Sequence, residues 1–234
     1  MKAVIVIPTY NEKENVPTLA AQIFANKIEG LEILFVDDNS PDGTAGIIRE
    51  LQTHYPIHLI SRAGKLGLGS AYIAGFKRAL ELGADYIFEM DADLSHVPAD
   101  VPRLLQAAVA GADLVIGSRK IAGGGVRGWG WMRHFMSNGA MWFSRLVLNL
   151  KPRDVTAGFR CFRRQVLETI GLDKITSNGY AFQEELLYRT QRAGFKIVEV
   201  PVWFIDRRNG YSKLSKKDIV EFFIKMVALR FSII

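Results

Sequence analysis

Two carboxylates one residue apart, Asp91 and Asp93, are the residues of this sequence that most directly suggest chemistry. They lie in the stretch FEMDADLSH, directly after an apolar run. Neighbouring carboxylates in a partly buried site repel each other unless a proton, a cation or solvent relieves the repulsion. The D-x-D spacing lets both face one Mg²⁺ or Mn²⁺ and leaves positions open for phosphate oxygens. A helix N-terminus, where acidic side chains are also favoured, is the alternative, and the spacing alone leaves both interpretations open.

Strand and helix patterns alternate along the first half of the chain. Short β-branched runs predict strands at residues 3–7, 32–36, 58–60, 85–90 and 113–117. Apolar residues at three and four spacing predict helices at 12–26, 43–55, 68–82 and 98–110. This alternation predicts an α/β fold with a mostly parallel sheet flanked by helices on both faces.

The second half of the chain has a different composition. After Gly117 it is rich in glycine and aromatic residues, and we expect a mobile loop followed by an aromatic helix. A segment DVTAGFRCF, a helix near 181–193 and a strand at 196–204 follow, and a basic amphipathic helix begins near residue 215. We therefore expect one domain over residues 1–214 and a C-terminal helix over 215–234.

Three polar segments directly follow predicted strands. They are PTYNE at 8–12, DDNSPDG at 37–43 and DADLSH at 91–96. In open α/β sheets, ligands bind outside the carboxyl ends of the strands, so we expect these segments to form one site. The first turn lacks G-x-G-x-x-G, and the chain has no G-x-x-x-x-G-K-[ST]. A divalent metal on carboxylates, supported by Arg and Lys, is therefore the expected means of holding a diphosphate.

Composition narrows the choice of partner. The 234 residues are 49% hydrophobic, which suffices for a sizeable core, and the formal net charge of +6 predicts an anionic partner. Nucleic acid, a phosphorylated ligand and an anionic membrane all fit that charge. A single cysteine, Cys161, excludes an internal disulfide and fits a reducing compartment. No run approaches the roughly 20 apolar residues of a spanning helix, and we expect the N-terminus to be a first strand rather than a secretion signal.

A series of motifs runs from about Lys2 to Ser215: PTYNE, VDDNSPDGT, GKLGLGSAYIAGF, DADLSH, GSR, DVTAGFRCF, GYAFQEELLYR and IDRRNGYSKLS. Their order resembles that of the dolichyl-phosphate mannosyltransferases, which are family-2 glycosyltransferases of the GT-A fold. The early motifs are shared by many family-2 enzymes, and the later ones are more specific to the polyprenyl-phosphate mannose synthase branch. The resemblance implies a catalytic domain over residues 1–214 that transfers mannose from GDP-mannose to a polyprenyl or dolichyl phosphate.

The resemblance also implies roles for individual residues. Asp91, Asp93 and Arg207 would be catalytic, and a Mg²⁺ or Mn²⁺ ion would bind Asp91 and Asp93, with Ser95 at a third position where some relatives have Gln. The implied donor-binding residues are Pro8, Tyr10, Glu12, Asp38, Lys65, Ala92, Gln183, Glu185 and Lys213. The implied acceptor-phosphate residues are Arg119, Arg133 and Ser137. A solvated surface charge is the alternative for each arginine, and no role is assigned to the four histidines.

The chemistry of such an acceptor agrees with this assignment. A phosphate monoester has its second pKa near 6, so it is largely a dianion at neutral pH and can attack a sugar carbon without a general base. The protein needs only to position the phosphate and to stabilise the departing nucleoside diphosphate. Direct attack from the opposite face predicts inversion at that carbon.

The segment WGWMRHFMSNGAMWF and the basic C-terminal helix suit a membrane interface, although core packing is the alternative for the first. We expect a peripheral protein at the cytoplasmic face of a membrane, anchored further by a small subunit or by a spanning segment after Ile234. Three rivals remain: transfer from another sugar nucleotide such as UDP-glucose, a non-catalytic binding module, and a nucleic-acid binder. The last is disfavoured because the acidic cluster would repel a phosphate backbone.

Overall fold

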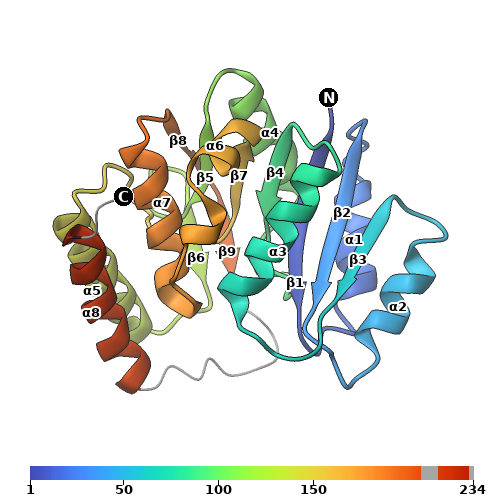
Figure 1. Ribbon diagram of the computed structural model, residues 1–234, viewed down its shortest axis with the longest axis horizontal. Coiled ribbons are helices and arrows are strands. Elements are labelled where there is room, and N and C mark those ends of the chain that lie inside the picture. Colours follow the sequence, from blue (N-terminus) through green and yellow to red (C-terminus); the bar gives the residue numbers. More distant parts are fainter. Residues whose placement is uncertain (207–215, 232–234) are drawn as a thin grey trace.

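The computed structural model describes residues 1–206 and 216–231, apart from the side chains of Tyr180 and residues 216–221. At its centre lies a seven-stranded sheet with strand order β3-β2-β1-β4-β7-β5-β8 (Figure 1). Its strands are β1 (Ala3–Thr9), β2 (Leu31–Asp37), β3 (Ile57–Ser61), β4 (Tyr86–Glu89), β5 (Leu114–Ser118), β7 (Arg160–Arg163) and β8 (Ile197–Pro201). Strand β7 runs antiparallel to β4 and β5, and the other pairings of this sheet are parallel. The predicted mostly parallel sheet is confirmed.

Helices cover both faces of the sheet because successive strand residues point to opposite sides. Ile5 and Ile7 of β1 enter one core cluster, with α1 (Val16–Phe24), α2 (Thr44–Leu51) and α4 (Val101–Val109). Val4 and Val6 enter the other, with α3 (Leu68–Glu81), α6 (Arg164–Thr169) and α7 (Phe182–Arg192). The described residues also contain three short 3₁₀ turns: η1 (Pro98–Asp100), η2 (Leu172–Lys174) and η3 (Gly179–Ala181).

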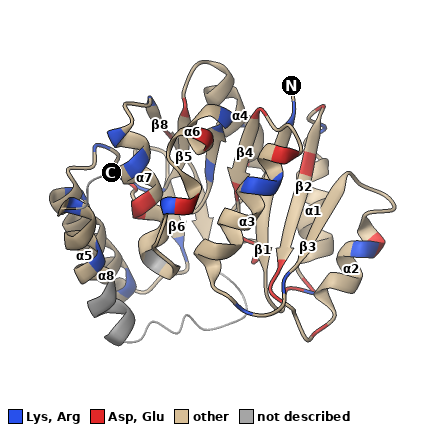
Figure 2. Cartoon of the chain, in the orientation of Figure 1, with Lys and Arg blue, Asp and Glu red and all other residues tan. Residues whose placement is uncertain are grey.

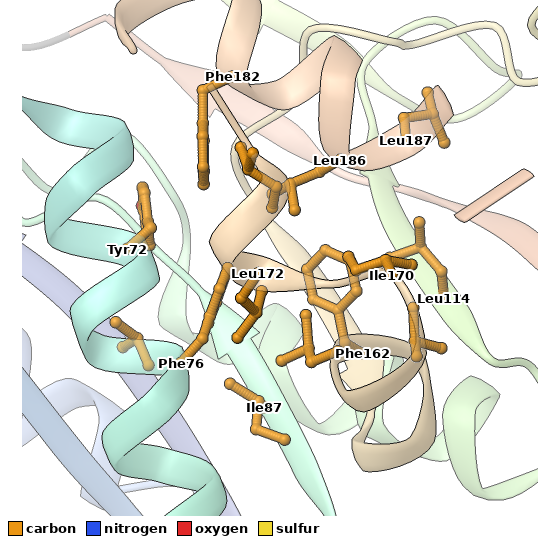
Figure 3. Close-up of a cluster of buried hydrophobic side chains, with 14 of the residues drawn as sticks. Tyr72, Phe76, Ile87, Leu114, Phe162, Ile170, Leu172, Phe182, Leu186 and Leu187 are labelled. Atoms are coloured by element: carbon orange, nitrogen blue, oxygen red, sulfur yellow. The ribbon is translucent and has the colours of Figure 1, made fainter. Parts of the chain in front are cut away.

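Aromatic rings join α3 to α7 in the second of these clusters (Figure 3). Tyr72 stacks on Phe182 with ring centroids 5.8 Å apart, and Phe76 meets Phe162 of β7 edge to face. These side chains are buried. The cluster therefore fixes the start of α7 against α3 beside the end of β4.

Two strands were not predicted from the sequence. Strand β7 lies in the DVTAGFRCF segment, and its residues RCFR hold too few apolar positions to show either period. The strand predicted over 196–204 is two strands, which are separated at Val202. Its second part, β9 (Trp203–Ile205), leaves the main sheet and pairs with β6 (Gly125–Arg127), inside the segment predicted to be a loop.

Helices α5 (Trp131–Leu148) and α8 (Lys216–Phe231) lie side by side at one end of the molecule (Figure 1). The Phe143 and Phe223 rings meet edge to face, with centroids 4.6 Å apart. Met226 of α8 is fully buried in the core, so this side of the helix packs inward. Across the described residues, no helix is both long and apolar enough to cross a bilayer.

Candidate active site

The polar loops that follow β1, β2, β4 and β5 lie at one edge of the sheet, because these strands point the same way. Strand β7 begins at that edge, since it runs in the opposite direction. Its first residue, Arg160, pairs with Glu89, the last residue of β4. The antiparallel strand therefore places residues 154–159 beside Asp91 and Asp93.

The loop of Asp91 and Asp93 is shaped by its own side chains. The backbone N–H of Ser95 donates to Oδ1 of Asp93 over 3.1 Å, and Leu94 adopts a left-handed φ of 61°. The Tyr72 hydroxyl of α3 donates to Oδ1 of Asp91 over 3.3 Å. The following helical turn starts only at Pro98 and has Asp100 as its acid. The two aspartates are therefore not first-turn acids, which removes the helix N-terminus alternative.

His96, to which the sequence assigned no role, holds this loop from inside. Its Nδ1 accepts the backbone N–H of Asp91 over 3.1 Å, and its ring stacks on Phe159 at 5.2 Å. Because Nδ1 accepts, the proton of the neutral ring is on Nε2, 3.8 Å from Oδ2 of Asp91. Burial lowers the pKa of His96, although Asp91 acts in the opposite direction. The spacing of five residues, which lets the ring reach back to Asp91, was the available sequence signal.

The donor set suits a hard divalent cation. Asp91 and Asp93 are both partly exposed, and they offer carboxylate oxygens one residue apart. Throughout the described part of the chain, no group of three His, Cys, Asp or Glu side chains is arranged to hold a metal. Ser95 is fully buried, and its hydroxyl has no hydrogen-bond partner among the described residues. Its role as a third metal ligand stays a prediction.

Several predicted donor residues lie at the carboxyl ends of β1 and β2. Lys65 Nζ lies 4.2 Å from the ring centre of Tyr10, which is exposed. Asp38 is buried, pairs with Arg62 over 2.9 Å and accepts the backbone N–H of Leu66 over 3.2 Å. Asp38 therefore fixes the loop that carries Lys65.

Three further residues predicted to bind the donor are half-buried or buried. Glu12 accepts a hydrogen bond from Asn15 over 2.7 Å. Pro8 is half-buried in β1 opposite Val36, and Ala92 is buried between the two aspartates. These contacts shape the edge of the site from within the fold.

Two adjacent glutamates in the first turn of α7 have different surroundings. Glu185 is buried and accepts hydrogen bonds from the backbone N–H of Ser177, over 2.8 Å, and from Arg189. Glu185 therefore holds the turn before α7, and its contact with the donor stays a prediction. Glu184 is also buried, but both of its oxygens lack a partner among the described residues. Burial raises the pKa of Glu184 to about 8.

A fully buried arginine, Arg160, fixes the segment between these elements. Its guanidinium donates to the carbonyls of Val155, Ala157 and Gln183 over 2.8–2.9 Å. Its Nε lies 3.9 Å from Glu89, whose pKa is raised by burial to about 8. Three main-chain carbonyls rather than a carboxylate therefore satisfy most of this guanidinium.

The predicted acceptor residues are held by acidic partners. Arg119 makes a two-pronged pair with Asp154 over 2.7 Å and also donates to Thr156. Burial opposes the charge of Asp154, but the hydrogen bonds from Arg119 lower its pKa overall. Arg119 and His96 line one small cavity. The structure thus brings Arg119 close to the aspartate loop.

Arg133 and Ser137 lie one turn apart near the start of α5. The Arg133 guanidinium lies 4.2 Å from the Trp129 ring and donates to Asp206 over 2.8 Å. Ser137 is half-buried. Arg207 and Lys213 lie outside the described residues. The boundary predicted at residue 214 falls outside them too.

The sequence profile of Glycosyl transferase family 2 matches residues 4–171. A polyprenol monophosphomannose synthase of Mycolicibacterium smegmatis is 45% identical over 227 residues, which span 96% of this chain and 85% of that protein. An undecaprenyl-phosphate mannosyltransferase of Micrococcus luteus is 44% identical over 92% of this chain and 88% of that protein. The family resemblance seen in the sequence motifs is confirmed.

Two solved structures support the fold. A glucosyl-3-phosphoglycerate synthase from Mycobacterium tuberculosis, solved with Mn²⁺, UDP-glucose and phosphoglyceric acid, superposes with a TM-score of 0.66 at 20% identity, over 98% of this chain and 79% of that one. A mannosyltransferase from Pyrobaculum calidifontis, solved with GDP-mannose and Mn²⁺, gives 0.62 at 16% identity, over 99% and 70%. The predicted GT-A fold is confirmed.

Proposed function

The chain belongs to glycosyl transferase family 2, and on that premise we propose that it transfers mannose from GDP-mannose to a polyprenyl monophosphate. The observation that carries the proposal is the edge of the sheet where two carboxylates suited to a divalent metal, Asp91 and Asp93, lie close to a largely buried arginine side chain, Arg119. Two relatives at 44–45% identity, both named for the transfer of mannose to polyprenol or its phosphate, support the choice of sugar and acceptor.

On the donor side, Asp91 and Asp93 would hold a Mg²⁺ or Mn²⁺ ion together with the donor diphosphate. Such an ion supplies neutralising charge for the departing nucleoside diphosphate. Tyr10 and Lys65, whose side chains stack at the open end of β1, are proposed to contact the guanosine half, and Asp38 holds the loop of Lys65. Arg207 and Lys213 are proposed to contact the donor as well, on the strength of their motif.

On the acceptor side, the phosphate dianion attacks the sugar carbon directly and inverts its configuration. Arg119, Arg133 and Ser137 are proposed to bind that phosphate, and an arginine fork suits a phosphate group. No general base is required, because the dianion already carries the attacking oxygen. Burial raises the pKa of Glu184 to about 8, so at neutral pH it is mostly protonated and adds little negative charge near Arg119.

The surface formed by α5 and α8 is proposed to contact the cytoplasmic face of a membrane. The exposed apolar side chains on these two helices are Trp131, Met132, Phe135, Met136, Trp142, Leu146, Phe223, Ile224, Val227 and Phe231. Figure 2 shows basic but no acidic positions on α5 and on the described part of α8. Each basic residue near an anionic leaflet contributes about 1 kcal/mol, and exposed aromatic side chains suit the interface. A membrane subunit or spanning segment is proposed as a further anchor.

The direct test is transfer of label from radioactive sugar nucleotides to a short polyprenyl phosphate in detergent. We expect labelled lipid from GDP-mannose and none from UDP-glucose. Lipid labelled only from UDP-glucose would keep the chemistry and replace the donor. The absence of labelled lipid from either donor would overturn the proposed function in favour of a binding module.

A further inference from the structure

The fold does not require a glycine at position 158. Its backbone does not adopt the left-handed conformation that excludes other residues. A methyl carbon added there would meet its neighbours at ordinary contact distances, the shortest being 3.7 Å. Two other glycines show what a structural requirement looks like. Gly67 has a left-handed φ of 97°, and a methyl carbon on Gly75 would lie 2.2 Å from Val6.

The space above Gly158 is bounded by polar groups of the proposed donor site. A methyl carbon there would lie 3.7 Å from Nε2 of Gln183, 3.8 Å from Cε1 of His96 and 3.9 Å from Oδ1 of Asp91. Gly158 itself is half-buried, so its Cα borders the open site. The gap above it is therefore about the size of one small polar group, with a carboxylate oxygen on one side and an amide on the other.

The amide of Gln183 presents a hydrogen-bond donor to this gap. Gln183 is 8% exposed, and its Nε2 is the atom nearest to a methyl carbon on Gly158. This N–H group can donate to a ligand hydroxyl. A hydroxyl can donate one hydrogen bond and accept another, so it suits a place between an amide and a carboxylate.

The backbone at Gly158 cannot easily move aside. On one side, the buried Arg160 binds the carbonyls of Val155 and Ala157. On the other, the Phe159 carbonyl accepts the backbone N–H of Gly117 over 2.8 Å. An added side chain would therefore fill the gap instead of being absorbed by a backbone shift.

We propose that Gly158 is a specificity-determining residue whose bare Cα admits a hydroxyl group of the transferred hexose between Gln183 and Asp91. The inference rests on the proposed function, since it assumes that the donor carries a hexose on a nucleoside diphosphate. Gly158→Ala fills this space without touching the positions proposed for the nucleoside.

Calorimetry with Mn²⁺ tests the proposal by comparing GDP and GDP-mannose on the wild-type protein, on Gly158→Ala and on Gly46→Ala. The control, Gly46, is a helical glycine on α2 whose added methyl carbon would meet nothing within 4 Å. We expect Gly158→Ala to bind GDP within about twofold of wild type and GDP-mannose about tenfold more weakly, as for the loss of one buried hydrogen-bonding group. The control should bind both as wild type does.

Equal affinity of wild type and Gly158→Ala for GDP-mannose would overturn the proposal, and so would an equal loss for GDP and GDP-mannose. A wild-type protein that binds UDP-glucose instead would contradict the proposed donor, and the same comparison with UDP and UDP-glucose would then decide the role of Gly158. A wild-type protein that binds the sugar nucleotide but labels no lipid would contradict the proposed function and leave this comparison intact.

Discussion

The backbone N–H of Asp91 donates a hydrogen bond to Nδ1 of His96 over 3.1 Å. The ring that accepts it stacks on Phe159 and meets Phe204 edge to face, so it is held in one orientation. The acidic loop is therefore fixed by a buried neutral histidine rather than by a helix end. This contact explains how two carboxylates keep one geometry at the end of β4.

His96→Phe should keep the ring stacking and lose the acceptor for the Asp91 N–H. We expect the catalytic rate to fall by about tenfold or more, because one unsatisfied backbone donor costs about 1–3 kcal/mol and frees the loop. Transfer assays at increasing Mn²⁺ concentration measure this effect. Wild-type rates at every Mn²⁺ concentration would show that the histidine is only a packing residue.

Glu184 should make the free energy of unfolding decrease as pH rises. Burial raises its pKa to about 8 in the folded protein, so between its ordinary value of 4.5 and about 8 the folded state binds more protons than the unfolded state. Stability should therefore fall as pH rises through this window. Arg160, Asp154 and Arg119 are the charged groups that act on it.

Glu184→Gln should reduce that dependence, since the amide stays neutral in both states, and the remaining slope should come from Glu89, whose pKa is also raised to about 8. Thermal unfolding at several pH values between about 5 and 8 measures the slope. The exposed Glu81→Gln variant is the matched control and should keep the wild-type slope. An unchanged slope in Glu184→Gln would mean that the folded protein holds this glutamate ionised.

Arg160 holds three carbonyls and lies beside Glu89 in the middle of the sheet. Arg160→Met should lower the free energy of unfolding by about 3–5 kcal/mol, because the buried groups lose their donor. Denaturant unfolding gives this value, and Arg163→Met, on the same strand but partly exposed, should cost less. A loss below about 1 kcal/mol is typical of a surface ion pair and would contradict this role of Arg160.

We expect the protein to bind membranes through the surface formed by α5 and α8. Substituting Ala for Trp131, Phe135 and Trp142, which are 66–76% exposed, should strongly reduce co-sedimentation with vesicles containing anionic lipid. Binding of GDP should be unaffected by these changes. Val109→Ala, which removes an exposed apolar group on α4, is the control. Unchanged sedimentation of the triple variant would place the membrane contact elsewhere.

The sequence predicted the edge of the sheet where the site lies. The polar segments after β1, β2 and β4 follow strands whose β-branched runs are clear, and the parallel arrangement brings their ends together. The position of Asp91 and Asp93 could therefore be predicted from spacing and topology alone.

The antiparallel strand and the histidine could not be predicted in the same way. Strand β7 has only Cys161 and Phe162 as apolar residues, so its place depends on pairing with two distant strands. His96 acts through a contact back to a main-chain group, which leaves no periodic signal. The tasks of Glu184 and Glu185 also differ only through tertiary contacts, because both lie in the first turn of α7.

Transfer of radiolabelled mannose to a short polyprenyl phosphate, with and without EDTA, tests the central claim most directly when wild type and Asp93→Ala are compared. We predict that EDTA abolishes wild-type transfer, that added Mn²⁺ restores it, and that folded Asp93→Ala is inactive in both conditions. Wild-type transfer that survives EDTA, or normal transfer by Asp93→Ala, would contradict a metal held on Asp91 and Asp93.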